Sequence, residues 1–135
     1  MSHTTTIKSN VVDLDALDAA VKALGGTLIR NVTEFTQCSA PGRCDHVIRL
    51  PSVRYEVGVA RNAEQNKYDL LYDPYGFDHS PRHDGHQLER RFGKGMATLT
   101  QHYNVERTAR LCQQHGKQVR RVTQPNGTIS LSQLS

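Results

Sequence analysis

The segment from Leu99 to Leu134 restricts the choice of folds more than any other part of the chain. Its first part has helical spacing and is followed by Gly116, which is placed like a helix-ending glycine with positive φ. Asn126-Gly127 then separates two strand-like runs, a pattern that predicts a β-hairpin closed by a two-residue turn. Ile129 and Leu131 alternate with polar residues, so we expect one buried face on the last strand. The chain is therefore expected to end in a helix and a hairpin, and neither of them names a reaction.

Size and composition predict one domain that covers residues 1–135 and lies in the cytoplasm. The chain has 135 residues, of which 36% are hydrophobic, enough to build a core without disulfide or metal staples. No apolar run approaches the roughly 20 residues of a membrane span, and the N-terminal sequence MSHTTTIKSN lacks the apolar centre of a signal peptide. Three cysteines, an odd number, fit a reducing compartment better than a disulfide framework. We expect no contact with a membrane.

Apolar periodicity predicts the other elements. Alternating patterns indicate strands over residues 3–12, 27–32, 46–50, 54–61 and 67–73. A helix over 14–24 follows Asp13, a predicted N-cap, and ends at Gly25-Gly26. Residues 33–45 and 74–86 combine proline, glycine and polar side chains, so we expect irregular structure in both segments.

A second helical pattern covers residues 88–103 and changes phase beyond Asn104. Gly93 and Gly95 lie inside it, and each costs about 1 kcal/mol of helix stability relative to alanine. After Asn104 the apolar stripe shifts to a new set of positions, Val105, Ala109 and Cys112. The pattern leaves open whether one long helix is present or two helices with a break near Asn104.

Together these elements predict an α+β fold. We expect a mostly antiparallel sheet with two helices on one face, followed by a C-terminal β-hairpin, because short connections favour antiparallel neighbours and each helix needs an apolar surface to cover. A ferredoxin-like core is the nearest named architecture. In the strand over 54–61, Tyr55, Val57 and Val59 face one way, while Glu56 and Gly58 face the other.

Positive charge collects in the C-terminal third of the chain. Residues 86–121 hold eight Lys and Arg against two Glu, a net of +6, so the rest carries −2 of the total of +4. Such a region suits nucleic acid or an acidic protein surface. The candidate binding residues are Arg90, Arg91, Arg107, Arg110, Arg120 and Arg121. The alternative is a solvated face whose arginines bind nothing.

Cysteines and histidines collect in the two segments that are expected to be irregular. Thiolates and imidazoles are the ligands that zinc prefers, and the candidates are Cys38, Cys44, His46, His79, His83 and His86. The gap between the two cysteines is wider than the usual two to four residues, so loops that bind no metal are the alternative. No residues have the spacing of a nucleophile with its base or of a phosphate-binding loop, and we assign no catalytic residue.

Several segments, taken in order, carry a resemblance over nearly the whole chain. They are Met1-Ser2-His3 with Thr5, Ile7 and Lys8, residues 13–26, 55–62, 68–73 and 99–103, Gly116, and residues 126–131. Together they resemble the hypothetical chloroplast open reading frame thirty-five family, which occurs in plastids, cyanobacteria, other bacteria and some phages. The sequence departs from that family at residues 74–77, where members usually carry a tryptophan-rich segment.

The resemblance implies an α+β fold and a cytoplasmic location, and it implies no activity or cofactor. Members look like accessory proteins, sometimes encoded near AAA-type ATPases. Three functions stay open at this point. The first is a non-enzymatic accessory protein that binds a protein partner through a sheet edge or the basic helix face, as an adaptor or as an inhibitor. Its partner would be an AAA-type ATPase, or a host protein if a phage encodes the chain. The second is nucleic-acid binding through the basic third, and the third is a small metalloprotein or enzyme with zinc in the Cys/His loops.

Overall fold

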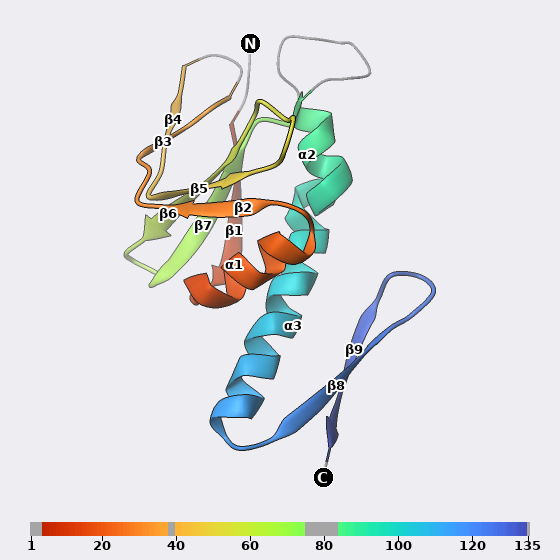
Figure 1. Cartoon of the computed structure of the whole chain (residues 1–135). Coiled ribbons are helices and arrows are strands. Elements are labelled where there is room, and N and C mark those ends of the chain that lie inside the picture. The colour runs from red at the N-terminus through yellow and green to blue at the C-terminus, as the bar shows by residue number, and fades with distance from the viewer. Residues whose placement is uncertain (1–3, 38–39, 75–83, 135) are drawn as a thin grey trace.

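Five strands form an antiparallel sheet at the centre of the molecule (Figure 1). The computed structural model describes residues 4–37, 40–74 and 84–134. In sheet order the strands are β1 (Thr5–Val11), β7 (Lys67–Tyr72), β6 (Val57–Asn62), β5 (His46–Arg49) and β2 (Thr27–Arg30), and every neighbouring pair is antiparallel. The five strands predicted before residue 74 are therefore confirmed, with small differences at their ends.

Helices cover one face of this sheet. They are α1 (Leu14–Ala23), α2 (Asp84–Phe92) and α3 (Ala97–Gln114), and a short 3-10 helix, η1 (Lys94–Met96), joins the last two (Figure 1). Between the helices and the sheet lies the main core, whose largest fully buried side chains include Leu17, Ile48, Leu70, Leu88, Phe92, Met96, Leu99 and Tyr103. Among the described residues, no helix is both long enough and apolar enough to span a membrane.

The side chain of Asp13 fixes the start of α1. Oδ1 of Asp13 accepts hydrogen bonds from the backbone N–H groups of Asp15 and Ala16 at 2.9 and 3.2 Å. These groups have no partner inside the helix, so the side chain satisfies them as an N-cap. The predicted cap is confirmed, and α1 covers the predicted range but for its last residue.

The α+β prediction is confirmed by the antiparallel sheet, its helices and the C-terminal hairpin. The layer of helices on one face of the sheet is the feature shared with a ferredoxin-like core. The connectivity is particular to this chain, because β2, β5, β6 and β7 all lie between α1 and α2 and form a meander. β1 then pairs with β7 and occupies one edge of the sheet.

A short hairpin, absent from the sequence-based prediction, packs on the other face of the sheet. The expectation of irregular structure over 33–45 is wrong in part, because β3 (Glu34–Phe35) pairs with β4 (Gly42–Arg43). The Phe35 ring is 1% exposed and lies over Gly58, where a Cβ atom would come within 2.5 Å of it. Since Gly58 leaves room for the ring, both faces of β6 are buried over its first half.

The break in the second helical pattern lies ahead of α3. Gly93, Gly95 and Met96 have φ values of 88°, 63° and 62°, in the left-handed region that ends a helix, and they separate α2 from α3. α3 runs through Asn104 without interruption. Neither of the two alternatives is therefore correct: two helices are present, but the break between them lies at residues 93–96 and not near Asn104.

The apolar residues of α3 shift to a different side of the helix beyond Asn104, because the helix packs against a different surface there. Leu99 and Tyr103 are buried in the main core. Val105 and Ala109 are also buried, with 8% and 2% of their surface exposed, yet they lie outside that core. The C-terminal hairpin packs against α3 and supplies the second surface.

That hairpin consists of β8 (Gln118–Thr123) and β9 (Ile129–Leu134), paired in antiparallel register. Gly116 has a φ of 72° just after α3, which confirms the predicted helix stop. Ile129 and Leu131 are half-buried, but so is Ser130 between them, so the predicted alternation of buried and exposed side chains along β9 is present only in part.

The turn between β8 and β9 is longer than predicted. The backbone N–H of Gln124 donates to the carbonyl of Thr128 at 2.7 Å, and the N–H of Gly127 donates to the carbonyl of Gln124 at 2.9 Å. Three residues, Pro125 to Gly127, therefore form the loop. Proline fixes its φ near −65°, which favours a type I turn followed by Gly127 at φ 88° over a two-residue turn.

Candidate interaction surface

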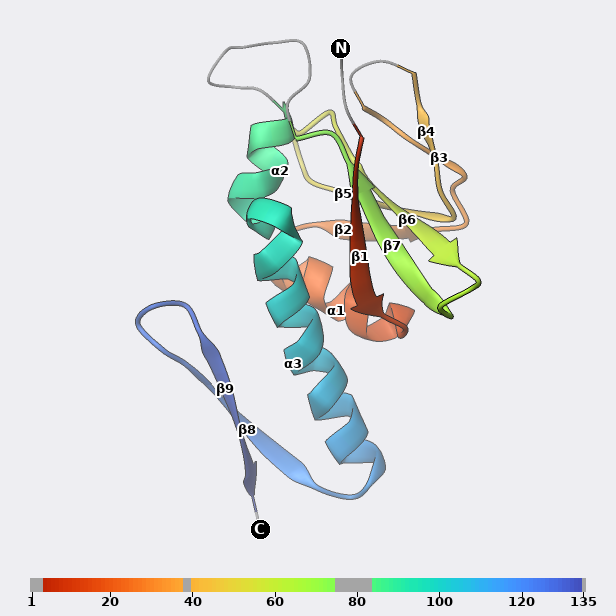
Figure 2. The same cartoon turned by 180° about the vertical axis from the view of Figure 1, so that it is seen from behind.

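The C-terminal arm is the part of the chain least enclosed by the rest of the fold. We use this name for residues 105–134, which comprise most of α3 with β8 and β9. Figures 1 and 2, seen from opposite sides, both show the hairpin beside α3 and apart from the five-stranded sheet. Its two strands form a sheet of their own. A two-stranded sheet is marginal alone, so α3 must support it.

One face of the hairpin is fixed to α3 by polar contacts as well as by the apolar stripe. Arg121 donates to both carboxylate oxygens of Glu106, with Nη1–Oε1 and Nη2–Oε2 distances of 2.5 and 3.3 Å. Nε2 of Gln101 donates to the carbonyl of Gly127 at 3.2 Å. A bidentate arginine–carboxylate pair is directional, so it holds β8 in one orientation on the helix.

The opposite face of the hairpin is open. Side chains alternate along a strand, so Arg120 and Val122 lie on the face of β8 opposite to Arg121, which contacts the helix. Val122 is 37% exposed and Arg120 is exposed. Within the described residues, neither outer edge of the hairpin pairs with a third strand. The arm therefore offers a basic open face and unpaired backbone groups along two edges.

The structure divides the six predicted binding arginines into two groups. Besides Arg121, two others make contacts inside the chain. Nη1 of Arg107 lies 3.7 Å from Oδ2 of Asp13, and Nη1 of Arg91 donates to the carbonyl of Leu24 at 3.1 Å. These three arginines connect α3 to β8, α3 to α1, and α2 to the end of α1. They hold elements together, although Arg91 and Arg121 remain exposed and Arg107 is half-buried.

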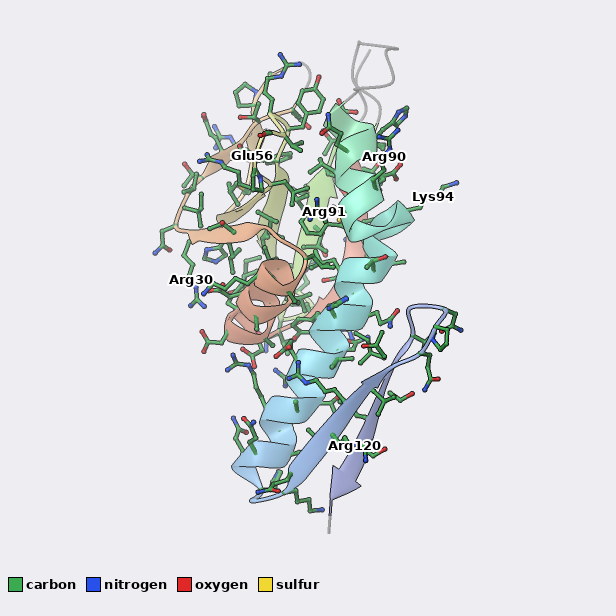
Figure 3. The ribbon with its side chains drawn as sticks, turned by 45° about the vertical axis from the view of Figure 1, so that its right-hand side comes forward. Arg30, Glu56, Arg90, Arg91, Lys94 and Arg120 are labelled. Carbon is green, nitrogen blue, oxygen red and sulfur yellow. The ribbon has the colours of Figure 1, made fainter. Side chains whose placement is uncertain are left out.

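The remaining three arginines differ in exposure. Arg90 and Arg120 are exposed and make no hydrogen bond or ion pair with any residue that the structure describes. Arg110 is half-buried, and its Nε is buried without a hydrogen-bond partner among the described residues. Arg90 lies on α2 and Arg120 on β8 (Figure 3), so the predicted basic surface is not one continuous patch.

A cleft of about 410 Å³ opens where α2 meets the end of α1 and the turn after β5. Its lining residues are Gly25, Leu50, Pro51, Val53, Gln87, Arg90 and Arg91. Two guanidinium groups thus share a concave surface with apolar side chains, and none of its described lining residues is acidic. We call it the arginine cleft.

The candidate zinc ligands fall mostly outside the described part of the chain. Cys38, His79 and His83 lie outside the described residues. His86 is exposed on α2. In the described ranges, no three His, Cys, Asp or Glu side chains gather closely enough to hold a metal ion.

Cys44 and His46 are buried at the start of β5, where each makes a local hydrogen bond. The thiol of Cys44 contacts the carbonyl of Val32 at 3.2 Å, and burial raises the pKa of this thiol to about 11. Nδ1 of His46 accepts the backbone N–H of Asn31 at 3.1 Å, which requires this nitrogen to be unprotonated. Burial lowers the pKa of His46, so both factors favour the neutral ring.

His46 also lines a second, polar cleft of about 420 Å³. Its other lining residues are Asn31, Thr33, Asp45, Arg61 and Tyr68. Oδ2 of Asp45 accepts the backbone N–H of Arg61 at 2.6 Å, and the guanidinium of Arg61 lies 5.7 Å from the centre of the Tyr68 ring. Two lining side chains, His46 and Asp45, thus accept backbone N–H groups of two other lining residues, Asn31 and Arg61.

Neither cleft was foreseen as a unit in the sequence. The helix stop at Gly25-Gly26 was visible, but nothing local indicates that Arg91, far along the chain, approaches it. Comparison with protein-family models, with curated proteins and with solved structures finds no match. The function is therefore argued from geometry.

Proposed function

We propose that this protein is a non-enzymatic accessory module that binds a protein partner through its C-terminal arm. The observation that carries the proposal is the β8–β9 hairpin, a two-stranded sheet with one face fixed to α3 and both edges unpaired among the described residues. Unpaired strand edges are templates for β-strand addition, in which a partner segment extends the sheet through main-chain hydrogen bonds. An extended segment of a partner could therefore pair with an edge strand of the hairpin without a rearrangement of the fold.

The charge of β8 defines the chemistry of that segment. Lys117 and Arg120 are exposed at and beside β8, and no acidic residue occurs after Glu106 in the sequence. An extended segment that carries Asp or Glu would meet complementary charge along the β8 edge. A second copy of β8 would bring arginine against arginine, which opposes self-association through this edge. The partner we propose is therefore an acidic extended segment of another protein, whether the module acts as an adaptor or as an inhibitor.

The arginine contacts also argue against nucleic acid as the first choice. Three of the six candidate arginines already contact groups inside the chain, and the four exposed ones are divided between α2 and β8. Phosphate binding without base readout depends on several cations that follow one backbone. The resemblance noted in the sequence makes an AAA-type ATPase, or a host protein if the chain is phage-encoded, the first partner to examine.

The test is affinity capture from native cell lysate, with and without nuclease, followed by mass spectrometry. We compare the wild type with Arg120→Glu, which reverses charge on the arm, and with Lys94→Glu. Lys94 is exposed on η1 and points away from the body of the molecule (Figure 3), so it is a control for the same change of charge.

We expect one stoichiometric protein that survives nuclease treatment, is lost with Arg120→Glu and is retained with Lys94→Glu. A set of nucleic-acid-associated proteins that disappears with nuclease would instead favour nucleic-acid binding. Equal loss of the captured protein with both variants would refute the arm as the binding surface.

A further inference from the structure

The arginine cleft is separate from the arm and combines cationic and apolar walls. Leu50 is 4% exposed and contributes the apolar surface together with Pro51 and Val53, residues that follow β5. Arg90 and Arg91 contribute the charge from α2. A volume of about 410 Å³ is within the range of small-molecule sites. We propose that the arginine cleft binds the carboxylate of a ligand that carries a short branched apolar group.

Arg91 is held in position before any ligand arrives. Its Nη1 donates to the carbonyl of Leu24, at the C-terminal end of α1, where the helix dipole favours a cation. A side chain on residue 25 would obstruct this contact, because a Cβ atom there would lie 2.7 Å from the same nitrogen. Gly25 thus allows the approach, and its φ of 86° is one that glycine adopts without strain.

The guanidinium of Arg91 retains donors for a ligand. A guanidinium has five N–H groups in a planar fork, and the bond to Leu24 uses one of them. Two parallel N–H groups match the two oxygens of a carboxylate, which is the geometry that gives arginine its preference for this anion. Because the side chain is already positioned, less rotamer entropy is lost when a ligand binds.

Arg90 supplies a second charge that nothing in the described chain neutralises. It is exposed and has no ion pair with a described residue. The nearest acid in sequence, Glu89, accepts a hydrogen bond from the Tyr72 hydroxyl at 2.9 Å through its Oε2, on the side of α2 that faces the sheet. The positive potential in the cleft is therefore directed at an external anion.

The apolar wall selects among anions. Inorganic phosphate would meet the arginines and leave Leu50, Pro51 and Val53 uncovered. A carboxylate that carries an isobutyl group would cover them, at about 25 cal/mol per Å² of apolar surface removed from water. Free branched-chain carboxylic acids and peptides that end in leucine share this chemistry, so the experiment must separate the two sources.

The experiment is a titration of the full chain, labelled with ¹⁵N, followed by two-dimensional NMR. The probes are 4-methylpentanoate, its uncharged amide, N-acetyl-Ala-Leu with a free carboxylate, and inorganic phosphate, all at constant ionic strength. We expect saturable shifts of the backbone signals of residues 24–26, 50–53 and 87–91 with both carboxylates. Tighter binding of the peptide would identify a peptide terminus as the ligand, and tighter binding of 4-methylpentanoate would identify a free acid.

Variants locate the site. Arg90→Gln should weaken carboxylate binding about tenfold, since hydrogen bonds to charged groups contribute that much. Lys94→Gln, on η1, removes an exposed cation that does not line the cleft and should leave carboxylate affinity unchanged. Arg91→Gln also removes the contact at the end of α1, so unfolding is measured beside binding for that variant.

Equal binding of the acid and the amide, preference for phosphate, or an unchanged affinity in Arg90→Gln would overturn the proposal. This test is independent of the one for the C-terminal arm. Arg120→Glu tests whether the arm binds a protein partner, and Arg90→Gln tests whether the cleft binds a carboxylate.

Discussion

The hydroxyl of Tyr103 connects α3 to the junction between β1 and α1, and its removal should weaken the whole fold. Tyr103 is 1% exposed, and its oxygen accepts hydrogen bonds from the backbone N–H groups of Val12 and Asp13 at 2.9 and 3.1 Å. These two N–H groups precede the first turn of α1. In Tyr103→Phe both donors would lose their acceptor inside a packed interface.

The expected magnitude follows from these two donors. A buried donor left without a partner costs roughly 1 to 3 kcal/mol. Both N–H groups are partly buried, so each takes the lower end of that range and the two together give about 2 kcal/mol. The phenylalanine ring fills the same space, so no cavity contributes to the loss.

Urea unfolding monitored by circular dichroism measures this difference in the free energy of unfolding. Tyr68→Phe is the matched control, because its hydroxyl makes no hydrogen bond with the residues that the structure describes, while its ring contacts are kept. We expect Tyr68→Phe to stay within about 0.5 kcal/mol of the wild type. If Tyr103→Phe is also that close to the wild type, the hydroxyl is not the connection we describe.

Three further predictions concern the second core and the buried titratable groups. Gly58→Ala should lower the free energy of unfolding by about 1 to 3 kcal/mol, because its methyl group would displace the Phe35 ring; an unchanged urea midpoint contradicts this. Burial lowers the pKa of His46, so NMR should show this residue titrating below 6.5. Because the unfolded chain then binds the proton more readily than the folded one, the free energy of unfolding should fall as pH drops below about 6.5. A His46→Gln variant with the same pH dependence of stability would refute this. At pH 8 about 0.1% of Cys44 should be thiolate, given its pKa of about 11, so iodoacetamide should modify half-exposed Cys112 before Cys44 in peptide mass mapping, and equal rates for these two thiols would contradict this.

Elements that depend on local signals were predictable from the sequence. The N-cap at Asp13, the helix stop at Gly116 and the strand β9 each involve residues a few positions apart, and the structure confirms all three. The turn at Asn126-Gly127 shows the limit of this reasoning, because Pro125 changed the loop type although the hairpin itself formed as expected.

Features that depend on contacts between distant residues were not predictable. The segment around Phe35 resembles a loop because the glycine that receives its ring, Gly58, is on another strand. The partners of the arginines were equally hard to predict. Arg107 pairs with Asp13 and Arg121 pairs with Glu106, and the fold alone brings these residues together. A charge count therefore overstated the surface available to a ligand.

The continuity of α3 gives the molecule a gradient of protection against amide hydrogen exchange. The end near Leu99 is enclosed by the main core, whereas the half that ends at Gln114 is supported by Val105, Ala109, the ion pair of Arg107 with Asp13 and one face of the hairpin. Local opening should therefore begin at the hairpin and travel along the helix toward the sheet, leaving the main core closed. A partner segment that pairs with the hairpin would therefore slow amide hydrogen exchange first at the end of α3 farthest from the sheet. Protection would then extend along α3 toward the main core.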